Sequence, residues 1–143
     1  MKPRLLIADS DPDFCHVFQR FFSGRGYEVE TASDGLSCLE KLRRTNPVVL
    51  LLDWGLYWGG GDGVLAWLRE EWAMCGPAIV LTATAGSLPD VPTDASPPVV
   101  RILPKPFLLR ELLESLQNAV AKRGQEEAFN SNRSAVWSEL CLG

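Results

Sequence analysis

Short runs of apolar residues recur along this chain, and several of them stop at a polar side chain. The clearest run covers residues 48–52, all Val or Leu, and stops at Asp53. An unbroken apolar run of this kind is typical of a strand buried on both faces of a parallel sheet. Two later runs follow the same pattern: residues 78–81 end at Thr82, and residues 99–103 lead through Pro104 to Lys105. The polar groups therefore mark three predicted strand ends.

Between the runs, apolar residues recur at steps of three and four, which indicates helices with one buried face. Asp11 and Pro12 predict the first helix start, because a capping carboxylate precedes the residue best tolerated at the first helical position. The predicted strands cover residues 5–8, 27–31, 48–52, 78–81 and 99–103, and the predicted helices begin after Asp11, begin after Ser33 or Asp34, and cover residues 64–74 and 107–122. This alternation favours βα repeats around a parallel sheet.

One stretch interrupts this alternation of strands and helices, and another follows it at the end of the chain. Residues 86–98 contain four prolines, and each proline removes an N–H donor and obstructs the preceding helical turn. We expect one short turn there at most. The length of 143 residues fits a single domain, which we assign to residues 1–123. Residues 124–143 are expected to be a tail that is partly disordered or forms a short amphipathic turn.

Composition narrows the classes of function. A net charge of −4 gives no support for direct binding of nucleic acid or of an anionic membrane. The first apolar run, residues 5–8, is too short for a signal peptide or a membrane span, so we expect a cytoplasmic protein. The four cysteines form no CxxC pair, which favours buried or idle thiols over a metal site or a disulfide framework.

The strand ends suggest phosphoryl chemistry. The first strand is followed by Asp9, which is expected to approach Asp53 because parallel strands end at the same edge of a sheet. Two carboxylates, a backbone carbonyl and water suit Mg²⁺. Asp53 would then attack a phosphorus atom as the nucleophile. Lys105 and Thr82 would neutralise the phosphoryl oxygens and form hydrogen bonds with them.

These motifs resemble the receiver domain of two-component response regulators. The resemblance covers about residues 3–122 and rests on LLIADSDPDF, GYEVETASDG, PVVLLLDW, GDGVLAWLRE, AIVLTA and LPKPFLLRELLESL. It implies a flavodoxin-like three-layer α/β sandwich with a parallel sheet ordered 2-1-3-4-5, in which the fourth helix is short or missing. It also implies that Asp53 accepts the phosphoryl group, that Thr82 and Lys105 respond to it, and that Asp9 helps to bind Mg²⁺. The Lys105–Pro106 bond is a candidate cis peptide.

The chain departs from the family pattern near the metal. The acid pair of the family reads Asp9-Ser10 here, and a neutral hydroxyl in the second position predicts weaker Mg²⁺ binding. Asp11 is a possible substitute, although its place before Pro12 favours a helix cap. The backbone carbonyl of Gly55 remains a predicted metal ligand, because that contact needs no particular side chain.

Other departures concern the surfaces around the site. Tyr57 occupies the position of a family proline, and Asp62 lies nine residues after Asp53, so the loop between them carries an insertion. The aromatic switch position of the fifth strand is Ile102. The aromatic side chains after Asp53 belong either to a surface that binds a partner or to a loop that folds onto itself, and the sequence leaves both interpretations open: Trp54, Tyr57 and Trp58.

The resemblance predicts a stand-alone receiver that accepts a phosphoryl group on Asp53 from a sensor histidine kinase or a phosphotransfer protein. It would then signal to an unknown downstream protein, with no direct nucleic-acid contact. The alternative is a pseudo-receiver, which binds partners without phosphorylation. A hydrolytic enzyme is not expected, because no added base or substrate pocket is identifiable. His16 is expected to be a surface side chain rather than a phosphodonor.

Overall fold

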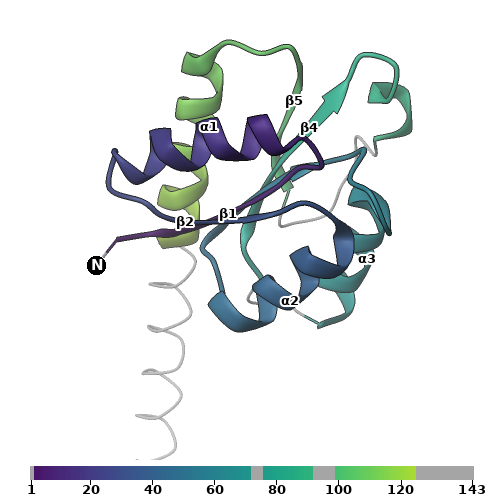
Figure 1. Cartoon of the computed structure of the whole chain (residues 1–143), viewed down its shortest axis with the longest axis horizontal. Coiled ribbons are helices and arrows are strands. Elements are labelled where there is room, and N and C mark those ends of the chain that lie inside the picture. Colours follow the sequence, from purple (N-terminus) through teal and green to yellow (C-terminus); the bar gives the residue numbers. More distant parts are fainter. Residues whose placement is uncertain (1, 72–75, 92–98, 125–143) are drawn as a thin grey trace, which may run out of the picture.

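Five apolar runs form the strands of one parallel sheet (Figure 1). The computed structural model describes residues 2–71, 76–91 and 99–124. The strands are β1 (Arg4–Ala8), β2 (Glu28–Ala32), β3 (Val49–Asp53), β4 (Ala78–Thr84) and β5 (Val99–Lys105). Their order is β2-β1-β3-β4-β5 and all four neighbouring pairs are parallel. The predicted order 2-1-3-4-5 is therefore confirmed.

Helices cover both faces of this sheet (Figure 1). Those that the structure describes are α1 (Pro12–Ser23), α2 (Gly35–Thr45), α3 (Gly60–Glu71), the short 3₁₀ turn η1 (Leu88–Asp90) and a C-terminal helix over residues 109–124. Side chains from α1 and the C-terminal helix pack on one face, and those from α2 and α3 pack on the other. The result is the three-layer sandwich that the sequence predicts.

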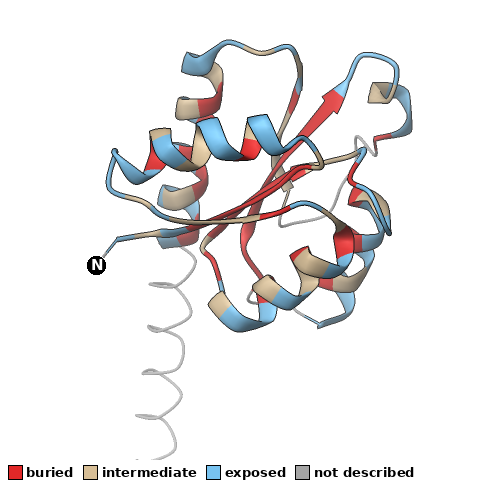
Figure 2. Ribbon diagram, viewed as in Figure 1, coloured by how far each residue is buried: buried red, intermediate tan, exposed pale blue. Residues whose placement is uncertain are grey.

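Alternation along the strands divides the core between the two faces, because successive strand residues point to opposite sides of a sheet. Leu50 and Leu52 of β3 pack with the α2 and α3 side, whereas Val49 and Leu51 pack with the α1 side. All four are fully buried. Figure 2 shows the consequence, with buried strands in the centre and exposed outer surfaces on the helices.

The first two predicted helices each begin with a capping carboxylate. Asp11 accepts a hydrogen bond from the N–H of Asp13 at 2.9 Å, and Pro12 is the first residue of α1. The capping interpretation of Asp11 is therefore confirmed. Asp34 caps α2 by accepting from the N–H of Ser37 at 2.7 Å, which resolves the choice between Ser33 and Asp34. These contacts satisfy N–H groups that lack partners in the first turn of a helix.

The segment between β4 and β5 holds the helical turn η1. Of the two expectations for the fourth helix, short or missing, the second is wrong because this turn is present. Residues 92–98, which contain three of the four prolines of this segment, lie outside the described residues. The prediction about the tail also falls outside them, since residues 125–143 are not described.

α3 begins at Gly60, earlier than the predicted residue 64. Two glycines open the helix, and a Cβ at Gly61 would lie 2.8 Å from the Cα of Trp54. The close approach of the loop therefore requires a glycine there. Within the described ranges, none of the helices has the length and apolar character needed to cross a bilayer.

Candidate functional site

The carboxyl ends of four strands bring the predicted site residues to one edge of the sheet. Asp9 follows β1, Asp53 ends β3, and Lys105 ends β5. In the register of the sheet, Asp53 pairs with Thr82, and Thr84 pairs with Lys105. Each predicted residue lies two positions after a side chain of the α1-side core, namely Ile7, Leu51, Val80 and Leu103. Strand alternation therefore places Asp9, Asp53, Thr82 and Lys105 on the same face.

Lys105 joins the two carboxylates. Its Nζ lies 2.6 Å from Oδ2 of Asp9 and 3.5 Å from Oδ1 of Asp53. The side chains of Asp9 and Asp53 are only 3% and 14% exposed, and that of Lys105 is 23% exposed. The Lys105–Pro106 peptide bond is cis, as expected from the resemblance. One ammonium group thus lies close to two largely buried carboxylates and partly neutralises the charge of both.

Further hydrogen bonds hold the side chain and the backbone of Asp9. Its Oδ1 accepts a hydrogen bond from the N–H of Asp11 at 2.9 Å, and its backbone carbonyl accepts one from the thiol of Cys15 at 3.2 Å. The Lys105 ammonium also lies 4.7 Å from the centre of the Phe14 ring. Hydrogen bonds to an ionised group are stronger than neutral ones, so the Asp9 carboxylate has a defined orientation.

Asp53 carries the less compensated charge of the pair. Burial raises the pKa of its carboxyl above the usual value, and the neighbouring charge of Asp9 raises the pKa further. Lys105 and a hydrogen bond from the backbone N–H of Gly55 oppose this shift. The balance is a carboxylate that is costly to ionise, because a buried charge loses its hydration. An added cation or a proton would relieve that cost.

Hard oxygen donors in this cluster suit Mg²⁺. Among the described residues, no group of three or more His, Cys, Asp or Glu side chains is arranged to hold a metal ion. The donor set is therefore the two carboxylates of Asp9 and Asp53, to be completed by backbone carbonyls and water. Mg²⁺ retains several waters and is commonly held by one or two carboxylates. The residues present fit that ion, and Lys105 already occupies the cation position between the two acids.

A cleft of about 320 Å³ opens over the site. Its lining includes Asp9, Asp53 and Lys105, together with Ser10, Asp11, Gly55, Tyr57, Thr84 and Ser87. Thr82 is buried, with 1% of its surface exposed, and is not among the lining residues. The cleft therefore has its acids and its ammonium as predicted, while Thr82 lies beneath the surface.

Sequence reasoning missed two hydroxyls in this cleft. The hydroxyl of Thr84 donates a hydrogen bond to that of Ser87 at 3.1 Å. A signal for Thr84 was available, because it follows Thr82 by two positions and so lies on the same face of β4. Ser87 lies beyond the strand, and its place at the cleft depends on the turn before η1.

The aromatic residues of the loop after β3 differ in how far they are buried. Trp54 packs against the α2 and α3 core, as does Leu56, which is 3% exposed. Tyr57 and Trp58 are 66% and 76% exposed. Part of the loop therefore folds onto the domain, and part remains available at the surface. We call residues 54–59 the aromatic loop.

Ser10 contacts this loop. Its hydroxyl oxygen accepts a hydrogen bond from the N–H of Tyr57 at 2.9 Å. The remaining sequence predictions lie away from the cleft: Asp62 is in the first turn of α3, His16 is exposed on α1, and Ile102 packs against the α2 and α3 side of the sheet. The exposure of His16 agrees with the expected surface side chain.

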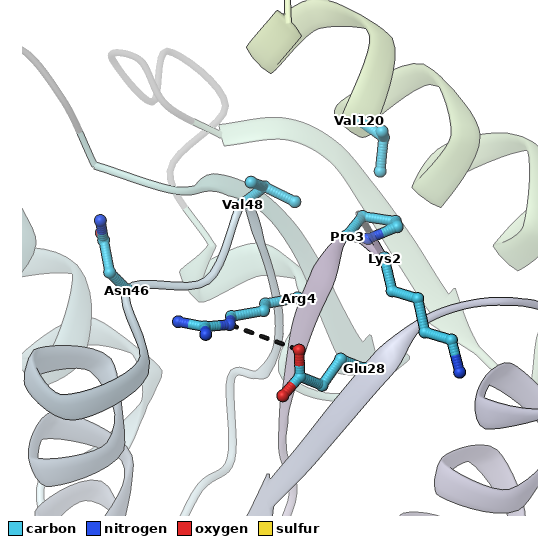
Figure 3. Close-up of a pocket in the computed structure, with 7 residues that line it drawn as sticks. All are labelled: Lys2, Pro3, Arg4, Glu28, Asn46, Val48 and Val120. Carbon is cyan, nitrogen blue, oxygen red and sulfur yellow. Dashed lines mark ion pairs between the residues drawn. The ribbon is translucent and has the colours of Figure 1, made fainter.

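A second hollow lies at the opposite edge of the sheet, where the strands begin (Figure 3). Its volume is about 630 Å³, and it is lined by Lys2, Pro3, Arg4, Glu28, Asn46, Val48 and Val120. Arg4 and Glu28 form an ion pair with a nitrogen-to-oxygen distance of 3.5 Å, and both side chains are more than half exposed. An exposed pair of this kind contributes little to stability. Substitutions of Arg4 or Glu28 can therefore serve as controls for substitutions in the cleft, because both residues lie far from it.

Known proteins match both the sequence and the fold. A sequence model of the family described as "Response regulator receiver domain" matches residues 5–117. Transcriptional regulatory protein PrrA of Mycobacterium leprae is 32% identical over 136 residues, which cover 94% of this chain and 57% of PrrA. Response regulator MprA of Mycobacterium tuberculosis is 31% identical over 142 residues, which cover 99% of this chain and 60% of MprA. The chain thus spans less than two thirds of these relatives.

Solved structures agree at the level of the fold. A response regulator receiver domain protein from Clostridium thermocellum superposes with a TM-score of 0.77 at 18% identity, covering 86% of this chain and 98% of that one. NtrX from Brucella abortus superposes with a TM-score of 0.80 at 19% identity, covering 92% of this chain and 29% of NtrX. Together with the match over residues 5–117, these findings show that the chain belongs to the response regulator receiver domain family of two-component systems.

Proposed function

We propose that this domain accepts a phosphoryl group on Asp53 and signals through protein contacts. The observation that carries the proposal is the position of Lys105, whose ammonium lies 3.5 Å from Asp53 and 2.6 Å from Asp9 at one end of the sheet. This arrangement provides a nucleophilic carboxylate beside a cation that can neutralise incoming phosphoryl oxygens. Phosphorylation and Mg²⁺ dependence are typical of the family.

In the proposed reaction, a carboxylate oxygen of Asp53 attacks the phosphorus atom of the donor. An O–P bond forms as the bond from phosphorus to the donor breaks, and the electron pair of that bond leaves with the donor atom. With a phosphohistidine donor, this atom is an imidazole nitrogen. Lys105 binds the transferred oxygens, and the hydroxyl of Thr82 donates a hydrogen bond once the group is in place. Mg²⁺, held by Asp9 and Asp53, would supply further neutralisation of the oxygen charge.

The proposed donors are a sensor histidine kinase or a phosphotransfer protein, and the proposed receiver of the signal is a second protein. The transferred group adds nearly two negative charges to the edge of the sheet. That charge would attract Lys105 away from Asp9 and reorganise the cleft surface. The change of surface is the proposed signal.

We also propose that Mg²⁺ binds more weakly here than to a site with two consecutive acids. Ser10 is neutral, and its hydroxyl accepts the hydrogen bond from Tyr57. The variant Ser10→Asp adds a carboxylate at this position and should lower the Mg²⁺ dissociation constant by about tenfold, equal to about 1.4 kcal/mol. Titration followed by tryptophan fluorescence measures it, because Trp54 adjoins Asp53. An unchanged constant would show that Ser10 does not limit the metal.

The phosphorylation test uses the whole chain. The protein is incubated with Mg²⁺ and phosphoramidate or acetyl phosphate, and its intact mass is then measured. One added phosphoryl group that is stable in acid and labile in base is expected, and Asp53→Asn should abolish it. Glu28→Gln, an acid-to-amide change at the remote hollow, should leave it unchanged. Absence of the adduct from the wild type, or its persistence in Asp53→Asn, would overturn the proposal.

A pseudo-receiver is the second candidate function. It is favoured by Ser10 in place of the second acid and by Ile102 at the aromatic switch position. A phosphorylation-independent partner would bind the wild type and Asp53→Asn with the same affinity. A receiver that signals through Asp53 would show a difference in partner affinity only after treatment with the phosphodonor.

A further inference from the structure

The backbone of Tyr57 is held at both its N–H and its carbonyl group. Its N–H donates to the hydroxyl oxygen of Ser10 at 2.9 Å, and its carbonyl accepts from the N–H of Gly35 at 2.8 Å. Ser10 follows β1, and Gly35 is the first residue of α2. The aromatic loop is therefore attached at one residue to two segments far from it in sequence.

The backbone of the loop needs such attachments. Trp58 has a φ of 55°, followed by φ values of 108° at Gly59 and 65° at Gly60. Positive φ is unfavourable for a bulky residue and persists only where its surroundings impose it. One imposing contact is the packing of Leu56 in the core. Another is the close fit at Gly35, where a Cβ would lie 2.0 Å from the carbonyl oxygen of Trp58.

The Ser10 contact differs from the others because it connects the loop directly to the cleft. Ser10, Tyr57 and Asp53 all line that cleft. The Asp53 side chain is only 14% exposed, so the position of the loop affects how much water reaches it. Gly35 and Leu56, by contrast, do not line the cleft.

We propose that Ser10 is a positioning residue, whose hydroxyl holds the aromatic loop against the end of β1 and keeps Tyr57 at the edge of the phosphoacceptor cleft. Loss of the hydroxyl frees the Tyr57 N–H, and the loop then opens more often. Greater access of water to Asp53 shortens the lifetime of a phosphoryl group there. This last consequence rests on the proposed function, whereas the movement of the loop does not.

Amide hydrogen exchange tests the movement directly. In Ser10→Ala, exchange at Tyr57 and Gly35 should both accelerate, by about fivefold or more, since one hydrogen bond is worth about that factor in an opening equilibrium. Ser10→Thr retains the hydroxyl and should restore the slow rates. The amide of Val48, bonded to the Arg4 carbonyl at 3.0 Å near the opposite edge of the sheet, should not change.

A matched control removes a serine hydroxyl elsewhere. Ser115 donates to the carbonyl of Glu111 within the C-terminal helix, so Ser115→Ala should leave exchange at Tyr57 and Gly35 unchanged. Acceleration at Tyr57 alone in Ser10→Ala would mean that Ser10 satisfies one N–H without positioning the loop. That result, or no change at either amide, overturns the inference.

The phosphoryl lifetime provides the second readout. If the wild type forms the adduct on Asp53, Ser10→Ala should lose it about fivefold faster and Ser10→Thr at the wild-type rate. An unchanged lifetime in Ser10→Ala would overturn the link between the loop and the cleft. If no adduct forms, the proposed function fails, while coupled exchange at Tyr57 and Gly35 still establishes the positioning role of Ser10.

Discussion

The ammonium of Lys105 lies 2.6 Å from the carboxylate of Asp9, closer than its distance of 3.5 Å from Asp53. The lysine therefore pairs most closely with the acid that is not the proposed phosphoacceptor. Both carboxylates depend on this one cation, since it bridges them in a largely buried cluster. The pairing links the stability of the domain to the chemistry of its cleft.

Replacement of Lys105 by methionine should destabilise the domain. The change keeps most of the apolar stem but leaves two carboxylates without their shared cation. Removal of one partner from a buried ion pair costs about 3–5 kcal/mol. Because the Lys105 side chain is 23% exposed, we expect a smaller loss of about 1–3 kcal/mol in the free energy of unfolding. Urea denaturation at pH 7 measures it.

Arg4→Met is the matched control for this variant. It removes a cation from an exposed ion pair and an exposed hydrogen bond to the carbonyl of Thr45, and it should cost about 1 kcal/mol or less. Added Mg²⁺ should recover part of the stability of Lys105→Met, because a ligand of the folded state stabilises it by mass action. Equal stability of Lys105→Met and the wild type would contradict the bridging role.

The stability of the domain should depend on the protonation of Asp53. Burial and the Asp9 charge raise the pKa of Asp53 in the folded state above its ordinary value of 3.8. The protonated acid thus favours folding below that ordinary value, and the contribution is lost as pH rises through the folded pKa. Asp53→Asn mimics the neutral acid and should be more stable than the wild type at pH 7.

Paired urea denaturations at pH 3 and pH 7 test this pH dependence. The greater free energy of unfolding of Asp53→Asn should be present at pH 7 and small at pH 3, where the acid is mostly protonated in both the folded and unfolded states of the wild type. Lys105 keeps its closer contact with Asp9 in the variant. If Asp53→Asn is instead less stable at pH 7, attraction between Lys105 and Asp53 outweighs the cost of burying the charge.

The sequence predicted which charged side chains lie together at the edge of the sheet, but not which carboxylate Lys105 contacts more closely. Apolar runs that stop at Asp53, at Thr82 and before Lys105 locate strand ends, and a parallel sheet brings those ends to one edge. The closer pairing of Lys105 with Asp9, at 2.6 Å against 3.5 Å for Asp53, depends on side-chain geometry at a scale below 1 Å. No periodicity in the sequence encodes such a difference.

Contacts of the loops were less accessible to prediction than the strand ends. Ser10 and Tyr57 are 47 positions apart, and their contact requires the path of an inserted loop with a positive φ at Trp58. From the sequence, Ser10 was interpretable only as a missing acid. The structure adds a second property, since its hydroxyl accepts the hydrogen bond that fixes Tyr57.

The buried thiols should resist chemical modification in the folded protein. Burial, with a contribution from the charge of Asp34, raises the pKa of Cys38 to about 12. Burial also raises the pKa of Cys15. Because the thiolate is the reactive form, only about one Cys38 in ten thousand would be reactive at pH 8, even with free access.

Alkylation with iodoacetamide followed by peptide mapping checks this expectation. Cys15 and Cys38 should remain unmodified in buffer over the period that labels a free cysteine peptide completely. Both should react in concentrated urea, which serves as the positive control. Rapid labelling of Cys38 under native conditions would show that α2 opens frequently.

Gly35 and Gly63 should respond in opposite directions to alanine. A Cβ at Gly35 would lie 2.0 Å from the carbonyl oxygen of Trp58, so the aromatic loop must shift to admit it. We expect a loss of about 1–3 kcal/mol in the free energy of unfolding, the usual cost of forcing an extra methyl group into a packed site. Exchange at Tyr57 should also accelerate, because the loop moves away from Ser10.

Gly63→Ala is the matched control in the neighbouring helix. No atom lies within 4 Å of the Cβ position at Gly63, which is inside α3. Alanine is favoured over glycine in a helix by about 0.5–1 kcal/mol, so this variant should be more stable than the wild type and retain slow exchange at Tyr57. Urea denaturation of the two variants compares the same chemical change in two environments. Equal effects would mean that the contact between Gly35 and Trp58 does not hold the loop, and that helix propensity alone governs both positions.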